Sequence, residues 1–205
     1  MNETEREFRT WLPPIEIRAA TGGKGLGTIV GLLVPYERLS DDMGGWFERF
    51  KRGAFKECLA RADEIVSLRD HDMARLLGRR SAGTARFTDT DEGVMMECDV
   101  PDVTYARDMM VSLERKDLKG MSCGFWHTTA DWTDLPDGKV IRVITKADLF
   151  DGSVVTWPAY PDTSIAVRSR PVKPSIILDP RDQHRSLLAR QRAPRYAAHQ
   201  PQAAK

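Results

Sequence analysis

The segment Leu118–Trp126, LKGMSCGFW, places Ser122 between two glycines at the start of an apolar run, which makes this serine a candidate nucleophile. A serine hydroxyl attacks well only when a neighbouring base takes its proton and nearby donors receive the developing negative charge. Most serines between glycines instead lie in turns, where the hydroxyl bonds the local backbone. A catalytic interpretation therefore depends on partners elsewhere in the chain.

His71 is the candidate base, because it follows a short apolar strand, Glu64–Leu68, at the point where the strand ends in a loop. Histidine has the unperturbed pKa closest to neutrality among the side chains, which suits it to move a proton. The alternative is a surface histidine among charged residues. The flanking acids Asp70 and Asp72 are poorly aimed at its ring, since adjacent residues of an extended segment point to opposite sides.

Cys123 directly follows Ser122 and is the rival nucleophile. If Ser122 faces a site from an extended segment, Cys123 faces the core, which argues against cysteine catalysis. The three cysteines, at positions 58, 98 and 123, are far apart and form no CxxC pair. That spacing argues against a disulfide framework or a zinc site, and we expect neither a metal nor another cofactor.

Length and composition predict one folded domain with a tail. The chain has 205 residues, of which 41% are hydrophobic and 30% charged, as in soluble globular proteins. No apolar run is long enough to span a bilayer, and the N-terminus lacks the features of a signal peptide, which predicts a cytoplasmic protein. From Arg168 onward nine Lys and Arg face two Asp and Glu, a balance of +7, whereas the first 167 residues carry −6.

Hydrophobic alternation predicts mostly strands. An antiparallel pair is expected from residues 15–20 and 28–37, and a hairpin from two runs on either side of LPDG at 135–138. Further strands are expected at Glu64–Leu68 and Gly93–Val100. In the last of these, four apolar side chains share one face: Val94, Met96, Cys98 and Val100.

Two helices are expected, a short one from about Ala54 after a loop, and a longer one after Pro101. Asp102 or Thr104 would cap the longer helix, and it would end near Gly120. Its apolar stripe comprises Tyr105, Met109, Met110, Leu113 and Leu118. Ser122 would then lie beyond a helix C-terminus, an end that does not favour an oxyanion, so the oxyanion donors would be loop or strand amides.

The chain thus divides into three parts. Residues 1–14 form a polar lead-in closed by two prolines, residues 15–167 form the folded domain, and residues 168–205 form a basic tail with five of the twelve prolines. This composition predicts a tail that is disordered, or weakly helical around 183–192.

Four segments, in this order, resemble blocks of the prohead protease family of tailed phages, which is related in fold to the herpesvirus assemblin proteases. They are FERFKRGAFKECL at 47–59, SLRDHDMARLLGR at 67–79, KGMSCGF at 119–125 and DLFDGSVVTWPAY at 148–160. The resemblance extends from about Thr28 to Ala166. It implies that Ser122 is the nucleophile, His71 the base and Asp151 the acid of a triad.

Three positions depart from the family pattern. Asp151 stands where glutamate is usual, so it could orient His71 only if the backbone lies closer. Gly152 stands where a bulkier residue is common, and Cys123 where an aromatic residue is common.

The fold implied by the resemblance is mainly β, or α+β: a compact, largely antiparallel β-barrel with a few flanking helices. The implied mechanism has His71 take the Ser122 proton during attack on a peptide carbonyl and return it to the leaving amine. Backbone amides at Ser122 and Cys123, helped by Arg79 or Arg80, would stabilise the oxyanion.

The implied function is that of a phage- or prophage-encoded serine endopeptidase, active inside the procapsid in the host cytoplasm. Its substrates would be the scaffold or the scaffolding segment of the major capsid protein, together with the protease itself. The resemblance leaves a homodimer open. The removable basic tail would bind the scaffold or the interior of the shell.

Two other functions remain open at this stage. One is a catalytically inactive scaffold or assembly protein with a protease-like fold, in which His71 and Ser122 would be too far apart to interact. The other is a nucleic-acid-binding protein that works through its basic tail. Against the latter, the folded region is acidic and shows no nucleic-acid-binding motif.

Overall fold

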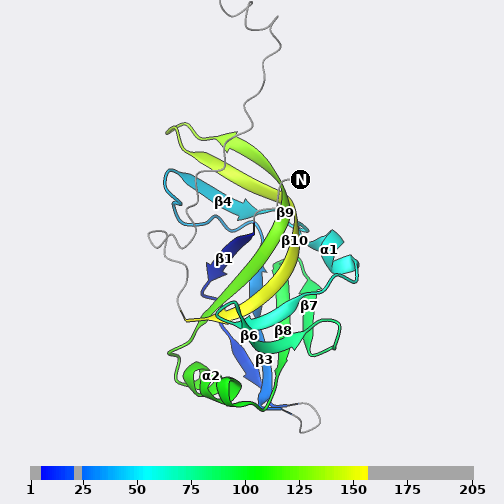
Figure 1. The fold of residues 1–205 in the computed structure, drawn as a ribbon. Helices are drawn as coiled ribbons and strands as arrows, with labels where there is room; N and C mark the ends of the chain where they lie inside the picture. Colours follow the sequence, from blue (N-terminus) through cyan, green and yellow to red (C-terminus); the bar gives the residue numbers. More distant parts are fainter. Residues whose placement is uncertain (1–5, 21–24, 157–205) are drawn as a thin grey trace, which may run out of the picture. The chain divides into compact units, whose positions relative to one another are not determined.

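The computed structural model describes residues 6–20 and 25–156, and the strands in these ranges form two sheets (Figure 1). The first sheet, called sheet A, has the order β1–β9–β10–β5–β6, and β4 also pairs with β10. Its strands are β1 (Glu7–Trp11), β4 (Trp46–Phe50), β5 (Val66–Arg69), β6 (Asp72–Arg79), β9 (Gly120–Asp134) and β10 (Val140–Val155). The predicted tail, residues 168–205, lies outside the described residues.

The second sheet, sheet B, has the order β2–β3–β8–β7. Its strands are β2 (Glu16–Arg18), β3 (Gly27–Pro35), β7 (Ala85–Asp89) and β8 (Gly93–Val100). The predicted antiparallel pair is confirmed as β2 and β3, and the predicted apolar face of β8 is fully buried. In β8 each buried side chain alternates with a more exposed one, because successive side chains of a strand point to opposite faces.

The two sheets pack against each other with the core between them. A Cβ atom on Gly152 of β10 would lie only 2.8 Å from Leu33 of β3 and 2.9 Å from Met96 of β8. Glycine at position 152 therefore allows sheet A to approach sheet B closely, which accounts for this departure from the family pattern. Apolar residues of both sheets form one continuous hydrophobic cluster.

The predicted hairpin around LPDG is confirmed as β9 and β10, two long curved strands that run through sheet A (Figure 1). Most strand pairs are antiparallel, but β10 pairs in parallel with β4 and β5. The expectation of a mainly β fold with few helices is confirmed. The strand pairs of the described residues make two separate sheets, so the closed barrel stays a prediction.

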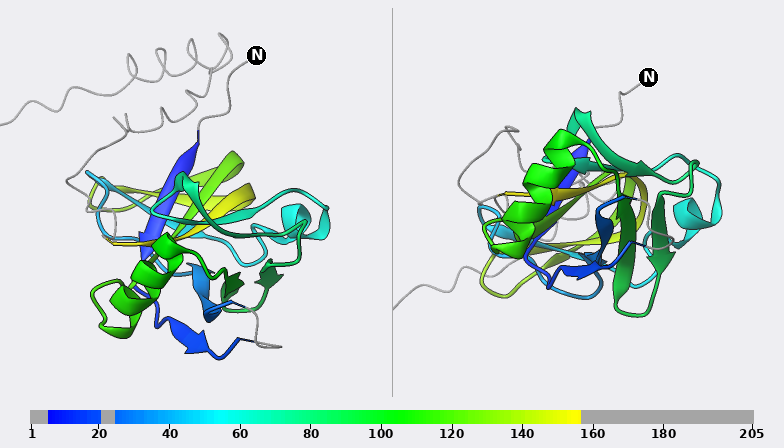
Figure 2. Two further views of the ribbon diagram at one scale, coloured as in Figure 1. Left: turned by 60° about the horizontal axis from the view of Figure 1, so that its bottom comes forward. Right: turned by 90° about the horizontal axis from the view of Figure 1, so that it is seen from below.

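Two strands were missed in the sequence. Residues 7–11, assigned to a polar lead-in, form β1 at the edge of sheet A, and residues 46–50, assigned to a loop, form β4. Both strands carry charged side chains that are buried against other charges, so neither shows a simple alternation of apolar and polar residues. Figure 2 shows β1 (blue) beside the β9 and β10 hairpin in two further views.

The two helices are α1 (Lys56–Ala60), as expected, and α2 (Thr104–Glu114). The predictions for the ends of α2 were wrong. Val103 is its N-cap, with no side-chain hydrogen bond, and the helix ends at Glu114 rather than near Gly120. Gly120 instead begins β9, so Ser122 lies within a strand and not beyond a helix terminus. Neither described helix has the length and apolar content that crossing a membrane requires.

Candidate active site

Ser122 lies on the outer face of sheet A, the face turned away from sheet B. Along β9 it alternates with Met121 and Cys123, which both point into the core. This arrangement follows the prediction that Ser122 and Cys123 face opposite ways. On the neighbouring strand β10, the residue that pairs with Ser122 is Ser153.

A β-bulge in β10 brings Asp151 to this outer face. The register shifts between Leu149, which pairs with Phe125, and Asp151, which pairs with Gly124. Leu149 points into the core, and strict alternation would send Asp151 there too. The extra residue at Phe150 reverses the alternation, so that Asp151 joins Ser153 on the outer face.

His71 reaches the same face from a tight turn between β5 and β6. Arg69 pairs with Asp72, so Asp70 and His71 form a two-residue hairpin loop. Their φ angles are 53° and 58°, as in a type I′ turn, which usually contains asparagine or glycine. The Asp70 carboxylate accepts a hydrogen bond from the Thr156 amide at 2.9 Å, which fastens the turn to the end of β10.

The three predicted site residues form one hydrogen-bonded line. The distance from His71 Nε2 to Ser122 Oγ is 2.7 Å, and His71 Nδ1 bonds Asp151 Oδ2. The inactive-scaffold alternative required Ser122 and His71 to lie apart, whereas they are within hydrogen-bond distance. As expected, Asp70 and Asp72 bond other groups, the former at Thr156 and the latter at the Ala74 amide.

The sequence reasoning missed a fourth member of this line, Ser153. Its hydroxyl donates a hydrogen bond of 2.7 Å to Asp151 Oδ1, and both residues are buried. Asp151 Oδ2 remains available for His71. Because Ser153 holds the other oxygen, it fixes the rotation of the Asp151 carboxylate. The quoted block DLFDGSVVTWPAY contains this serine two residues after the acid, which is a signal that could have indicated it.

Cys123 does not join the site. Its side chain is fully buried in the core, and burial raises the pKa of its thiol well above the usual value. A thiolate is the reactive form of cysteine, so this position disfavours the rival nucleophile. Its backbone lies in the middle of the sheet, paired with Arg9 on one side and Gly152 on the other.

The two arginines suggested for the oxyanion are engaged elsewhere, so this suggestion is not supported. The guanidinium of Arg80 donates to the carbonyl oxygens of Leu59 and Arg61, at 2.6 and 2.8 Å, and so holds the chain after α1. Arg79, the last residue of β6, has its guanidinium 3.7 Å from the carboxylate of Glu64. Three strand spacings, about 14 Å, separate β6 from β9, which is beyond the reach of an arginine side chain.

A second buried polar cluster lies on the core-facing side of sheet A, the side opposite to Ser122, and joins β1 to β4 and β10. Arg9 donates to both carboxylate oxygens of Glu48 on β4, at 2.5 and 2.9 Å. Arg142 on β10 bonds the same Glu48 at 2.9 Å and Glu7 at 2.5 and 2.8 Å. Two acids and two arginines thus compensate one another, as buried charges must. We call these four residues the charge cluster.

Opposite charges in this cluster favour the ionised forms of Glu7, Arg9 and Arg142. Burial alone would raise the pKa of Glu7, but the hydrogen bond from Arg142 and the positive charges of Arg9 and Arg142 outweigh it and lower this pKa. Burial likewise disfavours the charged form of Arg9, but the charge and hydrogen bonds of Glu48 outweigh it and raise the pKa of this guanidinium. Glu7 and Arg9 therefore both stay ionised at neutral pH.

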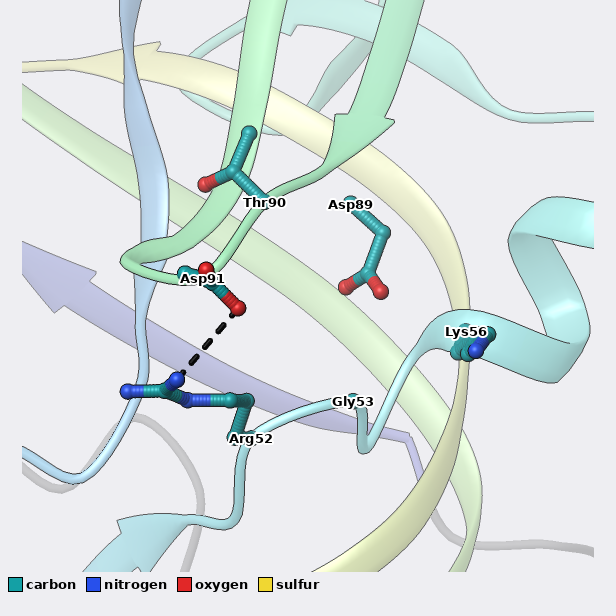
Figure 3. Close-up of a pocket in the computed structure, with 6 residues that line it drawn as sticks. All are labelled: Arg52, Gly53, Lys56, Asp89, Thr90 and Asp91. Carbon is teal, nitrogen blue, oxygen red and sulfur yellow. Dashed lines mark hydrogen bonds and ion pairs between the residues drawn. The ribbon is translucent and has the colours of Figure 1, made fainter.

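A pocket of about 500 Å³ lies elsewhere on the molecule (Figure 3). It is lined by Arg52, Gly53, Lys56, Asp89, Thr90 and Asp91. Arg52 and Asp91 form an ion pair of 3.3 Å across it, and its charges are balanced. Ser122, His71 and Asp151 are not among the residues that line this pocket, so the pocket and the hydrogen-bonded line are separate.

Two comparisons with known proteins bear on this arrangement. The chain matches the model of the caudovirus prohead serine protease family over residues 14–175. Its fold is similar to that of the capsid assembly protease gp21 of bacteriophage T4, with a TM-score of 0.52 and 13% sequence identity. That match covers 77% of this chain and 100% of the other. A search of curated proteins gave no match.

Proposed function

Because the chain belongs to the caudovirus prohead serine protease family, we propose that it is a serine endopeptidase of capsid maturation in which Ser122 is the nucleophile. The observation that carries this proposal is the line from Ser122 Oγ through His71 to Asp151 on one face of sheet A. A nucleophile bonded to a base, with the base bonded to an acid, is the arrangement that acyl transfer requires.

In this mechanism His71 takes the Ser122 proton at Nε2 as the hydroxyl attacks a peptide carbonyl, and later gives it to the leaving amine. The Asp151 carboxylate accepts the Nδ1–H of the ring and so selects the tautomer whose Nε2 can accept a proton. Ser153 holds that carboxylate in place. Aspartate can serve where glutamate is usual because the bulge at Phe150 places its side chain on the face of His71, where the carboxylate bonds Nδ1.

The proposed substrates are the scaffold and the scaffolding segment of the major capsid protein, cut inside the procapsid in the host cytoplasm. The neighbour from bacteriophage T4 is named a capsid assembly protease, which supports this class of substrate. Cleavage of the chain by itself, with removal of the basic tail at 168–205, belongs to the same proposal. Unchanged incorporation into proheads after deletion of this tail would contradict a role in packaging.

The proposal is tested by co-expressing the protein with its capsid and scaffold proteins and following their lengths by mass spectrometry. Wild-type protein is expected to shorten them, and Ser122→Ala is expected to leave them intact. Ser81→Ala removes a hydroxyl from an exposed serine and serves as the matched control. Retained cleavage in Ser122→Ala, or its loss in both variants alike, would remove the serine protease interpretation.

A further inference from the structure

The proposed base must reach across sheet A to meet the nucleophile. His71 follows β5, whereas Ser122 lies on β9, and two strand spacings, about 10 Å, separate these strands. A histidine side chain is shorter than this span, so the backbone at His71 must turn toward β10 for the ring to bond Ser122 at 2.7 Å. The orientation of the turn between β5 and β6 therefore decides whether the hydrogen-bonded line forms.

This turn has a backbone conformation that few residues adopt. Asp70 and His71 have φ angles of 53° and 58°, in the left-handed region that glycine enters most readily. Aspartate and histidine enter this region more often than most residues, but still against a steric cost. Two such residues in succession persist only where contacts from the surrounding structure hold them.

The Asp70 side chain supplies such a contact by taking the place of a backbone carbonyl. In a parallel ladder, a residue donates its N–H to one carbonyl of the facing strand and accepts from an amide two residues further along that strand. Asp70 donates its N–H to the Val154 carbonyl at 2.9 Å, as the parallel pairing of β5 and β10 requires. The Thr156 amide, however, donates to Asp70 Oδ1, also at 2.9 Å. The side chain thus adds a step to the ladder after the backbone has turned away.

Two further side chains close this contact into a ring. The guanidinium of Arg69 donates to Thr156 Oγ1 at 2.9 Å and pairs with the Asp70 carboxylate. Thr156 Oγ1 in turn donates to Asp70 Oδ2 at 3.3 Å. Both carboxylate oxygens are therefore engaged, in hydrogen bonds that the charge strengthens. We call Arg69, Asp70 and Thr156 the turn anchor.

The turn anchor joins the base to the strand of the acid. Thr156 directly follows β10, which carries Asp151, and His71 directly follows Asp70. A shift of the turn relative to β10 would therefore move the His71 ring away from Asp151 and Ser122 together. A misplacement of about 1 Å in a catalytic arrangement can lower the rate about 10²-fold.

We propose that Asp70 is a positioning residue for His71, because its carboxylate holds the left-handed turn that carries the histidine ring to the nucleophile. The printed partners of the Asp70 side chain all belong to the turn anchor, so Asp70 acts through the placement of His71 and not on the substrate. This inference rests on the proposed function, because it presumes that His71 is the base.

Two substitutions separate the anchor from the backbone conformation. Asp70→Gly adopts the left-handed φ freely but has no side chain to hold Thr156. Asp70→Asn also tolerates this φ, and its amide oxygen can accept the same hydrogen bond from the Thr156 N–H. On peptides from the scaffolding segment, Asp70→Gly should lower kcat by about 10- to 100-fold with little change in KM. Asp70→Asn should stay within about threefold of the wild-type kcat.

Asp72 flanks the same histidine from the other side and provides the matched control. Its carboxylate accepts from the Ala74 amide at 2.9 Å and pairs with Arg75 at 3.3 Å, both within β6. Asp72→Ala therefore removes an acid beside His71 without releasing the turn anchor. Its kcat should stay within about threefold of the wild-type value.

A second readout follows the ring itself. The proton on His71 Nδ1, which Asp151 accepts, gives a far-downfield NMR resonance in protein with isotope-labelled histidine. This resonance should be sharp in the wild type and in Asp70→Asn, and broadened or lost in Asp70→Gly as the ring leaves Asp151. A substitution that only lowered the stability of the fold would not change it under conditions where the protein stays folded.

An undiminished kcat in Asp70→Gly, or an equal loss in Asp72→Ala, would overturn the proposal and leave the proposed function intact. Equal losses in Asp70→Gly and Asp70→Asn would overturn it too, since they would assign the effect to charge. So would a reduced kcat with an unchanged His71 resonance, because the effect would then not pass through the ring.

Thr156→Val keeps the proposal open to refutation if Asp70→Gly does not fold. It removes the hydroxyl between Arg69 and Asp70 but keeps the amide, and it should lower kcat about threefold and broaden the resonance. Unchanged values would overturn the proposal. If the wild-type protein cuts no peptide at all, the proposed function fails, whereas the resonance still tests whether Asp70 positions the ring.

Discussion

The strand that carries Ser122 has two neighbours, and they differ in almost every respect. β10 is a 16-residue central strand within the family match, and it supplies Asp151 and Ser153 to the hydrogen-bonded line. β1 is a five-residue edge strand outside that match, and it supplies ion pairs and a ring that packs on His71. One neighbour supplies the acid and the hydroxyl that hold His71, and the other packs a ring against the same histidine.

The difference also appears in how each strand handles buried polar groups. On β10 a single carboxylate is satisfied by one hydroxyl and one imidazole, so removing any member changes the geometry at His71. β1 contributes one acid and one base, Glu7 and Arg9, and these bond an arginine and an acid on β10 and β4. Substitutions on the β10 side should therefore reduce catalysis, whereas those on the β1 side should change stability.

The largest effect on the β10 side is expected from Asp151→Asn. The amide can donate an N–H to His71 Nδ1, which holds the ring in the tautomer whose Nε2 already carries a proton and cannot take that of Ser122, so kcat should fall about 10⁴-fold. Asp148→Asn, on the same strand but bonded to Arg61, is the control and should retain activity. The measurement is kcat on a peptide from the capsid protein, and a loss below tenfold in Asp151→Asn would contradict the assigned role.

The largest effect on the β1 side is expected from Glu48→Ala. Both Arg9 and Arg142 lose a partner while remaining buried, and the free energy of unfolding should fall by about 3–5 kcal/mol. Glu16→Ala removes an exposed partner of Arg18 and should leave the free energy of unfolding nearly unchanged. Denaturant unfolding compares the two variants. Similar losses would mean that the cluster does not fix β1.

A smaller effect on the β10 side is expected from Ser153→Ala. Loss of one hydrogen bond to Asp151 should lower kcat about tenfold, equivalent to about 1.4 kcal/mol, with little change in KM. Ser153→Thr keeps the hydroxyl and should restore part of the rate. If Ser153→Ala loses stability alone and keeps its kcat, the residue does not position the acid.

The smallest effect is a pH dependence of the β1 contact. The pKa of Glu7 in the folded protein is lowered below its usual 4.5, so its contribution to stability is complete above pH 4.5 and is lost as the pH falls through the folded value. Hydrogen exchange in β1 should therefore be well protected near neutrality and weaken only in acid, once the faster intrinsic exchange at high pH is allowed for. Glu7→Gln should remove this dependence, and its persistence would assign the acid sensitivity to another group.

The same contrast explains which features the sequence could predict. Hydrophobic alternation predicts β8 and the β9 and β10 hairpin because their side chains alternate between core and solvent. The orientation of Asp151 was hidden, because a bulge at Phe150 reverses the alternation that the sequence suggests. The turn at Asp70 and His71 was hidden too, because its left-handed residues are not glycines.

β1 could not be found by the same reasoning. Arg9 is a buried charge, and such a residue argues against a strand unless its partner is known. The partner, Glu48, lies 39 positions further along the chain, and Arg142 lies 135 positions from Glu7. Only the folded arrangement of β1, β4 and β10 brings these charges together. The local pattern of residues 7–11 therefore predicts a polar lead-in and not a strand.

The most direct measurement is the site of covalent modification of the full chain by a small fluorophosphonate, mapped by mass spectrometry. We expect a single phosphonyl group on Ser122, absent in Ser122→Ala and strongly reduced in His71→Ala. His127→Ala changes an exposed histidine on the same strand and should leave the modification unchanged. Modification of Cys123 or another residue, or equal modification in His71→Ala, would contradict a nucleophile at Ser122 activated by His71.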